Sequence, residues 1–341
     1  YNIYEEKIMI NKQKITIKDI AKEVGCSIAT VSRVLSNKPS SMISEKTKET
    51  IIKKAHEMNY RPNRLAQALV TGTSKTIALF AYSITTDYYS FVISRLNSII
   101  KKDNYDLKII ESDNQLINTN LNELFVDGII LFDTVDYISE DIQKFALNNK
   151  PTVCIGSRYN KKYNYVISNL EEGYSNALNH LYNIGKRKIL LGENNPTELD
   201  YRIYQKFIKE KNLKPYIIEN ANFSSFNRHF EVNYNILAKY IKENGVDFDA
   251  ICCKSDSQAI AFIRCLTDNN IKIPEDVAIT GTDGTAVSNF YNPRLTTILQ
   301  PLDKMCEKSW EILKKHIENP DLPPESYTYD TELIIRESTV K

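Results

Sequence analysis

Apolar side chains recur every three or four positions in three short stretches of the first sixty residues. Thr16 begins a Ser/Thr-x-x-Asp/Glu capping box, which predicts a helix that ends at Gly25. Ser27 is suited to cap a second helix over 28–35, and a third is predicted over 45–59. The first two would form a helix-turn-helix that the third closes, although other small helical bundles share this periodicity. The predicted core residues are Ile17, Ile20, Ala21, Val24, Val31, Val34, Leu35, Ile51, Ile52, Ala55 and Met58.

Residues 61–72 read RPNRLAQALVTG and predict a different kind of segment. Pro62 suits a first helical turn and Gly72 a stop, which leaves a helix of about ten residues with little apolar face. A helix this short is marginal in water on its own. The sequence therefore predicts a linker whose folding depends on a partner.

Apolar runs of strand length alternate with helical patterns from Thr76 onward, beginning with TIALFAY, YDLKIIES and VDGIILF and continuing to DVAITGTD. This alternation predicts open parallel sheets covered on both faces, and ligands in such folds bind at the carboxyl ends of the strands. Each polar residue just past a strand end is thus a candidate, or else an ordinary cap or loop residue. These are Ser83, Asp113, Asp133, Arg158, Asn169, Arg202, Ser255, Asp256, Asp283 and Gln300.

Charge is divided unevenly along the chain. The 341 residues carry 44 Lys+Arg and 43 Asp+Glu, for a net charge of +1. Residues 1–72 hold 13 basic and 7 acidic residues, a net +6, whereas residues 73–341 hold 31 and 36, a net −5. This division predicts a small polyanion-binding unit joined to a larger body with another task.

Several classes of protein are excluded. The longest apolar runs are far shorter than the roughly 20 residues of a membrane helix. The N-terminus lacks a signal-peptide pattern, and Met9 is the expected native start. The six cysteines lack a C-x-x-C pair, so we expect buried, reduced thiols in a cytoplasmic protein with no metal and no cofactor. Nucleotide, hydrolase and zinc motifs are missing, which argues against an enzyme with catalytic residues.

The outward-facing residues of the second helix suit DNA recognition. Ser27, Thr30 and Ser32 offer hydroxyls for phosphates, and Arg33 is a long donor that can read a base edge. TIKDIAKEVGCSIATVSRVL followed by NYRPNRLAQAL closely resembles the LacI/GalR family of bacterial transcription factors. The resemblance implies that Ile28, Ala29 and Arg33 face bases. It further implies that Thr16, Ser27, Thr30 and Ser32 contact phosphates.

The resemblance also assigns the linker. In the family this segment is a hinge helix that folds on DNA, pairs with its dimer mate and inserts a leucine into the minor groove. Leu69 matches that leucine, and Asn63, Arg64 and Ala66 match its neighbours. The implied domains are an extension (1–14), a helix-turn-helix domain (15–60), the hinge helix (61–72) and an effector-binding domain (73–341).

The segments IPEDVAITGTD, NPRLTTILQPLDKMCEKSWEIL and TELIIRES extend the resemblance through the body. They imply a small all-α headpiece plus an α/β, periplasmic-binding-protein-like body of two doubly wound subdomains. The N-subdomain would span about 73–168 and 300–328, and the C-subdomain about 169–299 and 329–341. Arg202, Ser255, Asp256 and Asp283 match residues that hold sugar hydroxyls in the family. The full set of expected effector-binding residues is Ser83, Tyr88, Arg158, Asn169, Arg202, Ser255, Asp256 and Asp283.

We interpret the sequence as a homodimeric, sequence-specific DNA-binding regulator, a repressor of a carbohydrate-utilisation operon. It would bind a near-palindromic operator and a small sugar, with a galactoside-type sugar as the first guess. Two alternatives remain open. One is a catabolite-control regulator driven by a phosphorylated carrier protein; the other is a solute-binding or sugar-processing module, which should carry a secretion signal or a catalytic motif.

Overall fold

The computed structural model describes residues 15–35, 43–61, 72–81, 83–111, 124–133, 150–156, 164–192, 199–218 and 229–340. Contacts divide the chain into residues 1–74, which we call the headpiece, and residues 75–341, the body. Asn63, Arg64, Ala66, Leu69 and Arg158 lie outside the described residues.

Local hydrogen bonds place the headpiece helices where the sequence predicts them. These are α1 (Ile17–Val24), α2 (Ile28–Leu35) and α3 (Glu45–Glu57). The amide and hydroxyl of Thr16 donate to Asp19 Oδ2 over 2.8 and 2.7 Å, and these bonds lower the pKa of Asp19. Gly25, with φ of +70°, ends α1 in the left-handed conformation that glycine adopts without strain.

Ile20, Val31 and Ile51 have no exposed surface and form the centre of the headpiece core. The prediction that Ile52 also lies in this core is wrong, because its side chain is 56% exposed. Successive helical residues point about 100° apart, so Ile51 faces the core with Ala55, four positions later, and Ile52 is turned to solvent.

The described part of the body contains two mainly parallel sheets, as predicted, and each has six strands. The first has the order β11-β5-β4-β3-β1-β2, and all its neighbours are parallel. With helices α5 (Asp87–Lys102) and α11 (Leu302–Glu318) it forms the N-subdomain. Its strands are β1 (Thr76–Ala81), β2 (Asp106–Glu111), β3 (Gly128–Phe132), β4 (Thr152–Ile155), β5 (Asn164–Ser168) and β11 (Ser326–Tyr329).

The second sheet has the order β12-β10-β9-β8-β6-β7 and is parallel except for the antiparallel pair β10 and β12. Among the residues that the structure describes, it forms the C-subdomain with four α-helices and the short 3-10 helix η2 (Ala286–Asn289). Its strands are β6 (Ile189–Leu191), β7 (Tyr216–Ile217), β8 (Ala250–Cys252), β9 (Ala278–Asp283), β10 (Thr296–Leu299) and β12 (Glu332–Ile334). Its α-helices are α7 (Leu170–Asn183), α8 (Leu199–Lys211), α9 (His229–Asn244) and α10 (Asp256–Asp268).

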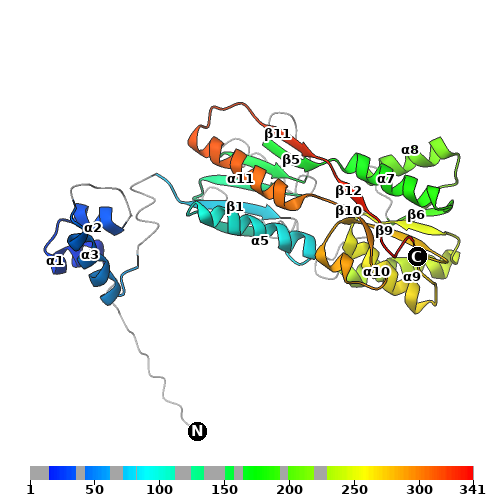
Figure 1. Cartoon of the computed structure of the whole chain (residues 1–341), viewed down its shortest axis with the longest axis horizontal. Helices are drawn as coiled ribbons and strands as arrows, with labels where there is room; N and C mark the ends of the chain where they lie inside the picture. Colours follow the sequence, from blue (N-terminus) through cyan, green and yellow to red (C-terminus); the bar gives the residue numbers. More distant parts are fainter. Residues whose placement is uncertain are drawn as a thin grey trace, which may run out of the picture. The chain divides into compact units, whose positions relative to one another are not determined.

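The described chain passes between the sheets at three places: from β5 to α7, from β10 to α11 and from β11 to β12 (Figure 1). Each crossing starts at the carboxyl end of a strand. Polar residues that follow these strands therefore come from both subdomains and from segments far apart in sequence.

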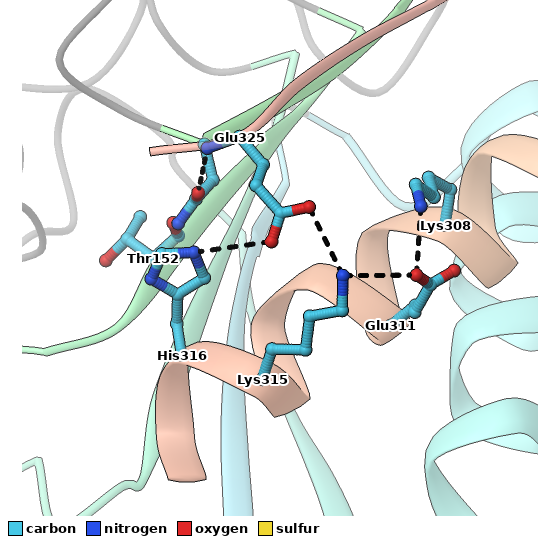
Figure 2. A network of polar contacts seen from close by, with 7 residues as sticks. Thr152, Lys308, Glu311, Lys315, His316 and Glu325 are labelled. Atoms are coloured by element: carbon cyan, nitrogen blue, oxygen red, sulfur yellow. Dashed lines mark hydrogen bonds and ion pairs between the residues drawn. The ribbon is translucent and has the colours of Figure 1, made fainter. Parts of the chain in front are cut away.

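Charged residues on α11 hold the start of β11, as Figure 2 shows. The amide of Glu325 donates to Asn164 Oδ1 over 2.8 Å. Lys315 Nζ lies 3.3 Å from Glu325 Oε2 and 3.4 Å from Glu311 Oε1, while His316 Nε2 lies 3.9 Å from Glu325 Oε1. These contacts fix the return of the chain from α11 to the edge of the first sheet.

The thiols also match the prediction, since all six cysteines are free and all but the half-buried Cys26 are buried. Within the described part of the chain, no helix has the length and apolar character needed to cross a membrane.

The contrast between Ile51 and Ile52 gives a direct test of the headpiece core. Ile51→Ala should destabilise the headpiece by about 3 kcal/mol, because it leaves a cavity in a very small core. Ile52→Ala should change its stability by less than about 0.5 kcal/mol. Hydrogen exchange of the α1, α2 and α3 amides, followed by mass spectrometry, measures both; equal protection in the two variants would contradict the assigned packing.

Candidate DNA-binding and effector sites

The first turn of α2 presents small and apolar side chains to solvent. Ser27 Oγ accepts the amide of Thr30 over 3.0 Å and lies 2.9 Å from its hydroxyl, which caps the helix. Ile28 is 48% exposed, and Ala29 and Arg33 are exposed as well. An exposed isoleucine at a helix start can gain burial against a thymine methyl group, while an arginine one turn later can reach a base edge.

The predicted phosphate-contacting residues also have surface positions. Thr16 is exposed at the start of α1, and Ser32 is partly exposed on α2. Both helix starts present backbone amides with them, and such amides are ordinary partners of phosphate oxygens. Every predicted DNA contact within the described residues is thus accessible from solvent.

A chain of hydrogen bonds joins the two subdomains at the carboxyl ends of their strands. Ser168 Oγ, at the end of β5, donates to Gln300 Oε1 over 2.8 Å. Gln300 Nε2 donates to Asp283 Oδ1, at the end of β9, over 3.0 Å. We call Ser168, Asp283 and Gln300 the bridging residues. All three are buried, with 6–8% of their surface exposed.

Aromatic rings from the N-subdomain lie close to this bridge. The Tyr88 ring packs against Tyr89 and Phe132, with centroids 5.2 and 5.3 Å away. The Tyr88 hydroxyl makes a hydrogen bond with Asp133. Burial raises the pKa of Tyr88, and the negative charges of Asp133 and Asp283 raise it further, so both carboxyl groups face this phenol. An aromatic face beside carboxylates suits a polyhydroxylated ligand.

Asp256 lies behind this edge. Its side chain has no exposed surface. Oδ2 accepts the amide and the hydroxyl of Thr285 over 2.7 and 2.8 Å, and Oδ1 accepts the hydroxyl of Thr297 over 2.5 Å. The protein itself encloses and occupies both oxygens, and direct contact of Asp256 with an effector stays a prediction. Its role is to position the segment that follows Asp283.

Two glycines allow this packing. A Cβ on Gly281 would lie 2.4 Å from Asp256 Oδ1, so only glycine lets the carboxylate approach β9. Gly284 has φ of +71°, and a Cβ there would lie 2.9 Å from the Cα of Leu299. The glycines of the G-T-D-G segment, residues 281–284, are therefore needed for the backbone geometry around Asp283.

Burial governs the charge of the two aspartates. Burial raises the pKa of Asp256 to about 6, against the lowering effect of its hydrogen bonds from Thr297 and Thr285. Burial also holds the pKa of Asp283 well above its usual range, and the charges of Asp256 and Asp133 add to the effect. Ligand hydroxyls that donate to Asp283 would stabilise its ionised form.

The other predicted effector residues occupy more local positions. Ser83 is buried and accepts the amide of Thr85 over 3.2 Å. Asn169 Nδ2 donates to Glu172 over 3.0 Å at the start of α7. Ser255 Oγ caps α10 by accepting the amide of Gln258 over 3.1 Å. Arg202 is exposed on α8. The structure thus brings Tyr88 and Asp283 together and leaves these four residues on separate segments.

The resemblance did not select three residues of this cluster. The sequence did offer Asp133 and Gln300 as candidates, because each is a polar residue just past the end of a predicted strand. Ser168 carries no such signal, because it is the last residue of a strand and pairs with a side chain 132 positions away. Across the described ranges, no three His, Cys, Asp or Glu side chains are grouped to hold a metal ion.

Comparison with known proteins places this geometry in a family. Residues 16–63 match the model of bacterial regulatory proteins of the lacI family, and residues 178–339 match a periplasmic binding protein-like domain. The chain is 30% identical over 336 residues to the uncharacterized HTH-type transcriptional regulator YvdE of Bacillus subtilis, with 95% of this chain and 99% of YvdE covered. The chain belongs to the lacI family. It is therefore a DNA-binding transcriptional regulator and not an enzyme.

Two further comparisons describe similar members of the lacI family. The ribose operon repressor of Halalkalibacterium halodurans is 27% identical over 333 residues, covering 95% of this chain and 97% of that one. The lac repressor dimer bound to operator and the anti-inducer ONPF has a TM-score of 0.77 at 22% identity, covering 96% of this chain and all of that one. This structure confirms the predicted fold, a helix-turn-helix headpiece with a two-sheet α/β body.

The buried carboxylate of Asp256 makes a testable prediction for this lacI-family body. Asp256→Ala should destabilise the body by about 3 kcal/mol, because it leaves the Thr285 amide without its buried acceptor. Asp256→Asn retains an acceptor and should cost less.

Wild type and Asp256→Asn should also differ in how their stability depends on pH. The pKa of Asp256 rises from 3.8 to about 6 on folding, so the folded state keeps a proton that the unfolded state loses. Asp256 therefore makes stability fall as pH rises from about 4 to 6, and Asp256→Asn should lack this component. Thermal unfolding across that pH range, compared between wild type and Asp256→Asn, checks it; parallel curves would contradict the assigned burial.

Proposed function

We propose that this regulator is a cytoplasmic, homodimeric repressor of a carbohydrate-utilisation operon. Two headpieces bind a near-palindromic operator, and a small sugar bound between the N- and C-subdomains controls operator affinity. The observation that carries this proposal is the bridge from Asp283 through Gln300 to Ser168, which puts polar groups of both subdomains at one ligand-binding edge. A ligand held there favours one relative arrangement of the subdomains over another.

DNA recognition rests on the exposed face of α2. Arg33 reads a base edge, Ile28 and Ala29 contribute apolar contacts, and Thr16, Ser27, Thr30 and Ser32 hold phosphates. In this proposal the hinge segment, with Asn63, Arg64, Ala66 and Leu69, contacts the minor groove at the operator centre. The net charge of +6 on residues 1–72 supports the phosphate contribution.

Effector recognition rests on Asp283, with Asp133 and Tyr88 on the facing wall. Carboxylates accept hydrogen bonds from sugar hydroxyls, and the Tyr88 ring offers a flat apolar surface. Ser83, Arg158, Asn169, Arg202 and Ser255 would complete the site, whereas Asp256 positions it from behind. The ribose operon repressor among the relatives supports a carbohydrate effector, and a galactoside-type sugar is a specific candidate to test.

Dimerisation supports operator binding by symmetry, since two headpieces match two half-sites. The lac repressor of similar fold is a dimer on its operator. Phe290, at the end of η2, is 84% exposed and offers an aromatic side chain that a partner subunit would bury. Linkage then requires that operator and effector change each other's affinity by the same factor.

Control by a phosphorylated carrier protein finds less support. Such a partner needs a cationic surface on the N-subdomain. The exposed first turns of α11 instead carry Asp303 and Glu307, and both pair with Arg95 at 2.7 and 2.5 Å. Arg95 is thus already paired with two carboxylates of the chain, which favours a small molecule as the controlling ligand.

Replacement of Arg33 tests the DNA-binding proposal. A duplex is first selected from a randomised pool with the full-length protein, and its affinity is measured by gel shift. Arg33→Ala should lower affinity for this duplex by about tenfold or more and leave affinity for unselected DNA much less changed. Lys22→Ala, which removes an exposed cation from α1, is the matched control and should affect both duplexes alike. Full retention of selectivity by Arg33→Ala would refute the assignment of α2.

Replacement of Asp283 tests the effector proposal. Thermal shift against mono- and disaccharides, including galactosides, should identify a stabilising sugar for wild type. Asp283→Asn keeps the acceptor for Gln300 but loses the charge, so affinity for that sugar should fall by about tenfold to a hundredfold. Asp321→Asn, on an exposed loop, is the control and should bind as wild type does. An undiminished shift in Asp283→Asn would move the site elsewhere.

A further inference from the structure

Lys75 is the first residue of the body, and its backbone is tied to two strands of the first sheet. Its amide donates to Asp127 Oδ2, just before β3, over 3.0 Å. Its carbonyl accepts the amide of Asp106, the first residue of β2, over 2.8 Å. Its φ is +51°, a left-handed value that non-glycine residues adopt only where surrounding contacts hold it. The chain therefore enters the body through a turn of fixed geometry.

The Lys75 side chain is exposed at the surface and contacts one ring of the core. Its ammonium group lies 4.2 Å from the centroid of the Tyr105 ring. Tyr105 in turn meets Trp310 of α11 edge to face, with centroids 5.2 Å apart. Both rings are buried, with 6% and 4% of their surface exposed. A cation over the face of a buried ring is a directional contact, so it fixes the side chain as well as the backbone.

One hydrogen bond holds the indole of Trp310, and a second contact holds its acceptor, Asp103. Trp310 Nε1 donates to Asp103 Oδ2 over 2.7 Å, and Lys314 Nζ lies 2.7 Å from Asp103 Oδ1. Both bonds lower the pKa of Asp103, which keeps it ionised at neutral pH. We call Lys75, Tyr105, Trp310 and Asp103 the hinge anchor. It links the entry point of the chain to the middle of α11.

The same helix begins at the effector edge. α11 starts at Leu302, two residues after Gln300, which bonds to both Asp283 and Ser168. Trp310 follows eight residues later, about 12 Å along the helix axis. A helix packed against α5 and the first sheet moves as a rigid rod. A ligand that displaced Gln300 would therefore act on the first turn of the helix that carries Trp310.

We propose that the hinge anchor positions the linker between body and headpiece, so that Lys75 and Trp310 contribute to specific DNA affinity without contacting DNA. The proposal rests on the proposed function, since it concerns how the effector edge and the headpiece communicate. Lys75 and Trp310 act as positioning residues. The contribution comes from the direction that the anchor gives to the chain as it leaves the body.

The only tryptophan in the sequence is Trp310, so its fluorescence reports this one site. The probes are the duplex selected with full-length wild type and an unselected duplex of equal length. Binding of the selected duplex should change the emission of Trp310, because Lys75 joins the linker to the contact between Tyr105 and Trp310. The unselected duplex should leave the emission near that of the free protein.

Two variants test the contribution to affinity. Lys75→Gln and Trp310→Phe should each weaken binding of the selected duplex by about threefold to tenfold, the range expected for loss of a cation–π contact. Affinity for unselected DNA should stay the same. Lys308→Gln is the matched control. Lys308 is on the same helix as Trp310, and its ammonium group lies 5.5 Å from the centroid of the Tyr327 ring, outside the hinge anchor. Circular dichroism confirms that each variant is folded.

Several results would overturn the proposal. One is unchanged Trp310 emission while a gel shift shows the selected duplex bound. Another is an equal loss of affinity for both duplexes in Lys75→Gln with a salt dependence reduced by about one charge, which would make Lys75 a phosphate contact. Wild type that selects no duplex at all would overturn the proposed function together with the anchor.

Discussion

The body depends on the hydrogen bonds of Gln300 to the ends of two different sheets. Ser168 closes β5 in the first sheet and Asp283 closes β9 in the second, and Gln300 accepts from one and donates to the other. An amide side chain suits this place because it carries a donor and an acceptor at once. The bridge lies where the chain crosses between sheets, so any change in its length alters the relation between the subdomains. In the proposed function, effector recognition and control of the headpiece share this set of contacts.

Around this bridge, a few hydrogen-bond donors stabilise a buried charge. Asp256 is fully buried, and the hydrogen bonds from Thr285 and Thr297 offset part of the cost of removing its carboxylate from water. Gly281 makes room for that carboxylate beside β9. The result is a rigid loop that presents Asp283 with a raised pKa and little access to water. A ligand that donates hydrogen bonds meets an acceptor whose position is already determined.

The headpiece and the body differ in their distribution of charge. The headpiece gathers a net charge of +6 with the linker, presents hydroxyls and Arg33 on α2, and has only a small apolar core. The body carries the balancing −5, which DNA repels, and buries several carboxyl groups near its ligand edge. In the proposed mechanism, communication between them passes through the chain at Lys75. The contact of Lys75 with Tyr105, and that of Tyr105 with Trp310, fix the point at which the chain enters the body.

Local patterns in the sequence determined the headpiece helices, the alternating strands and helices of the body, and the family. The capping pair Thr16 and Asp19 and the stop at Gly25 act within a few residues, so the sequence alone specifies them. Contacts between distant segments were decided by strand order and crossings: Ser168 meets Gln300 132 residues later, and Asp103 meets Trp310 207 residues later. The tertiary structure also decided the exposure of Ile52 and the burial of Asp256, because burial depends on which neighbour covers each face. Periodicity places a side chain on a face, and only the packed structure determines what lies against it.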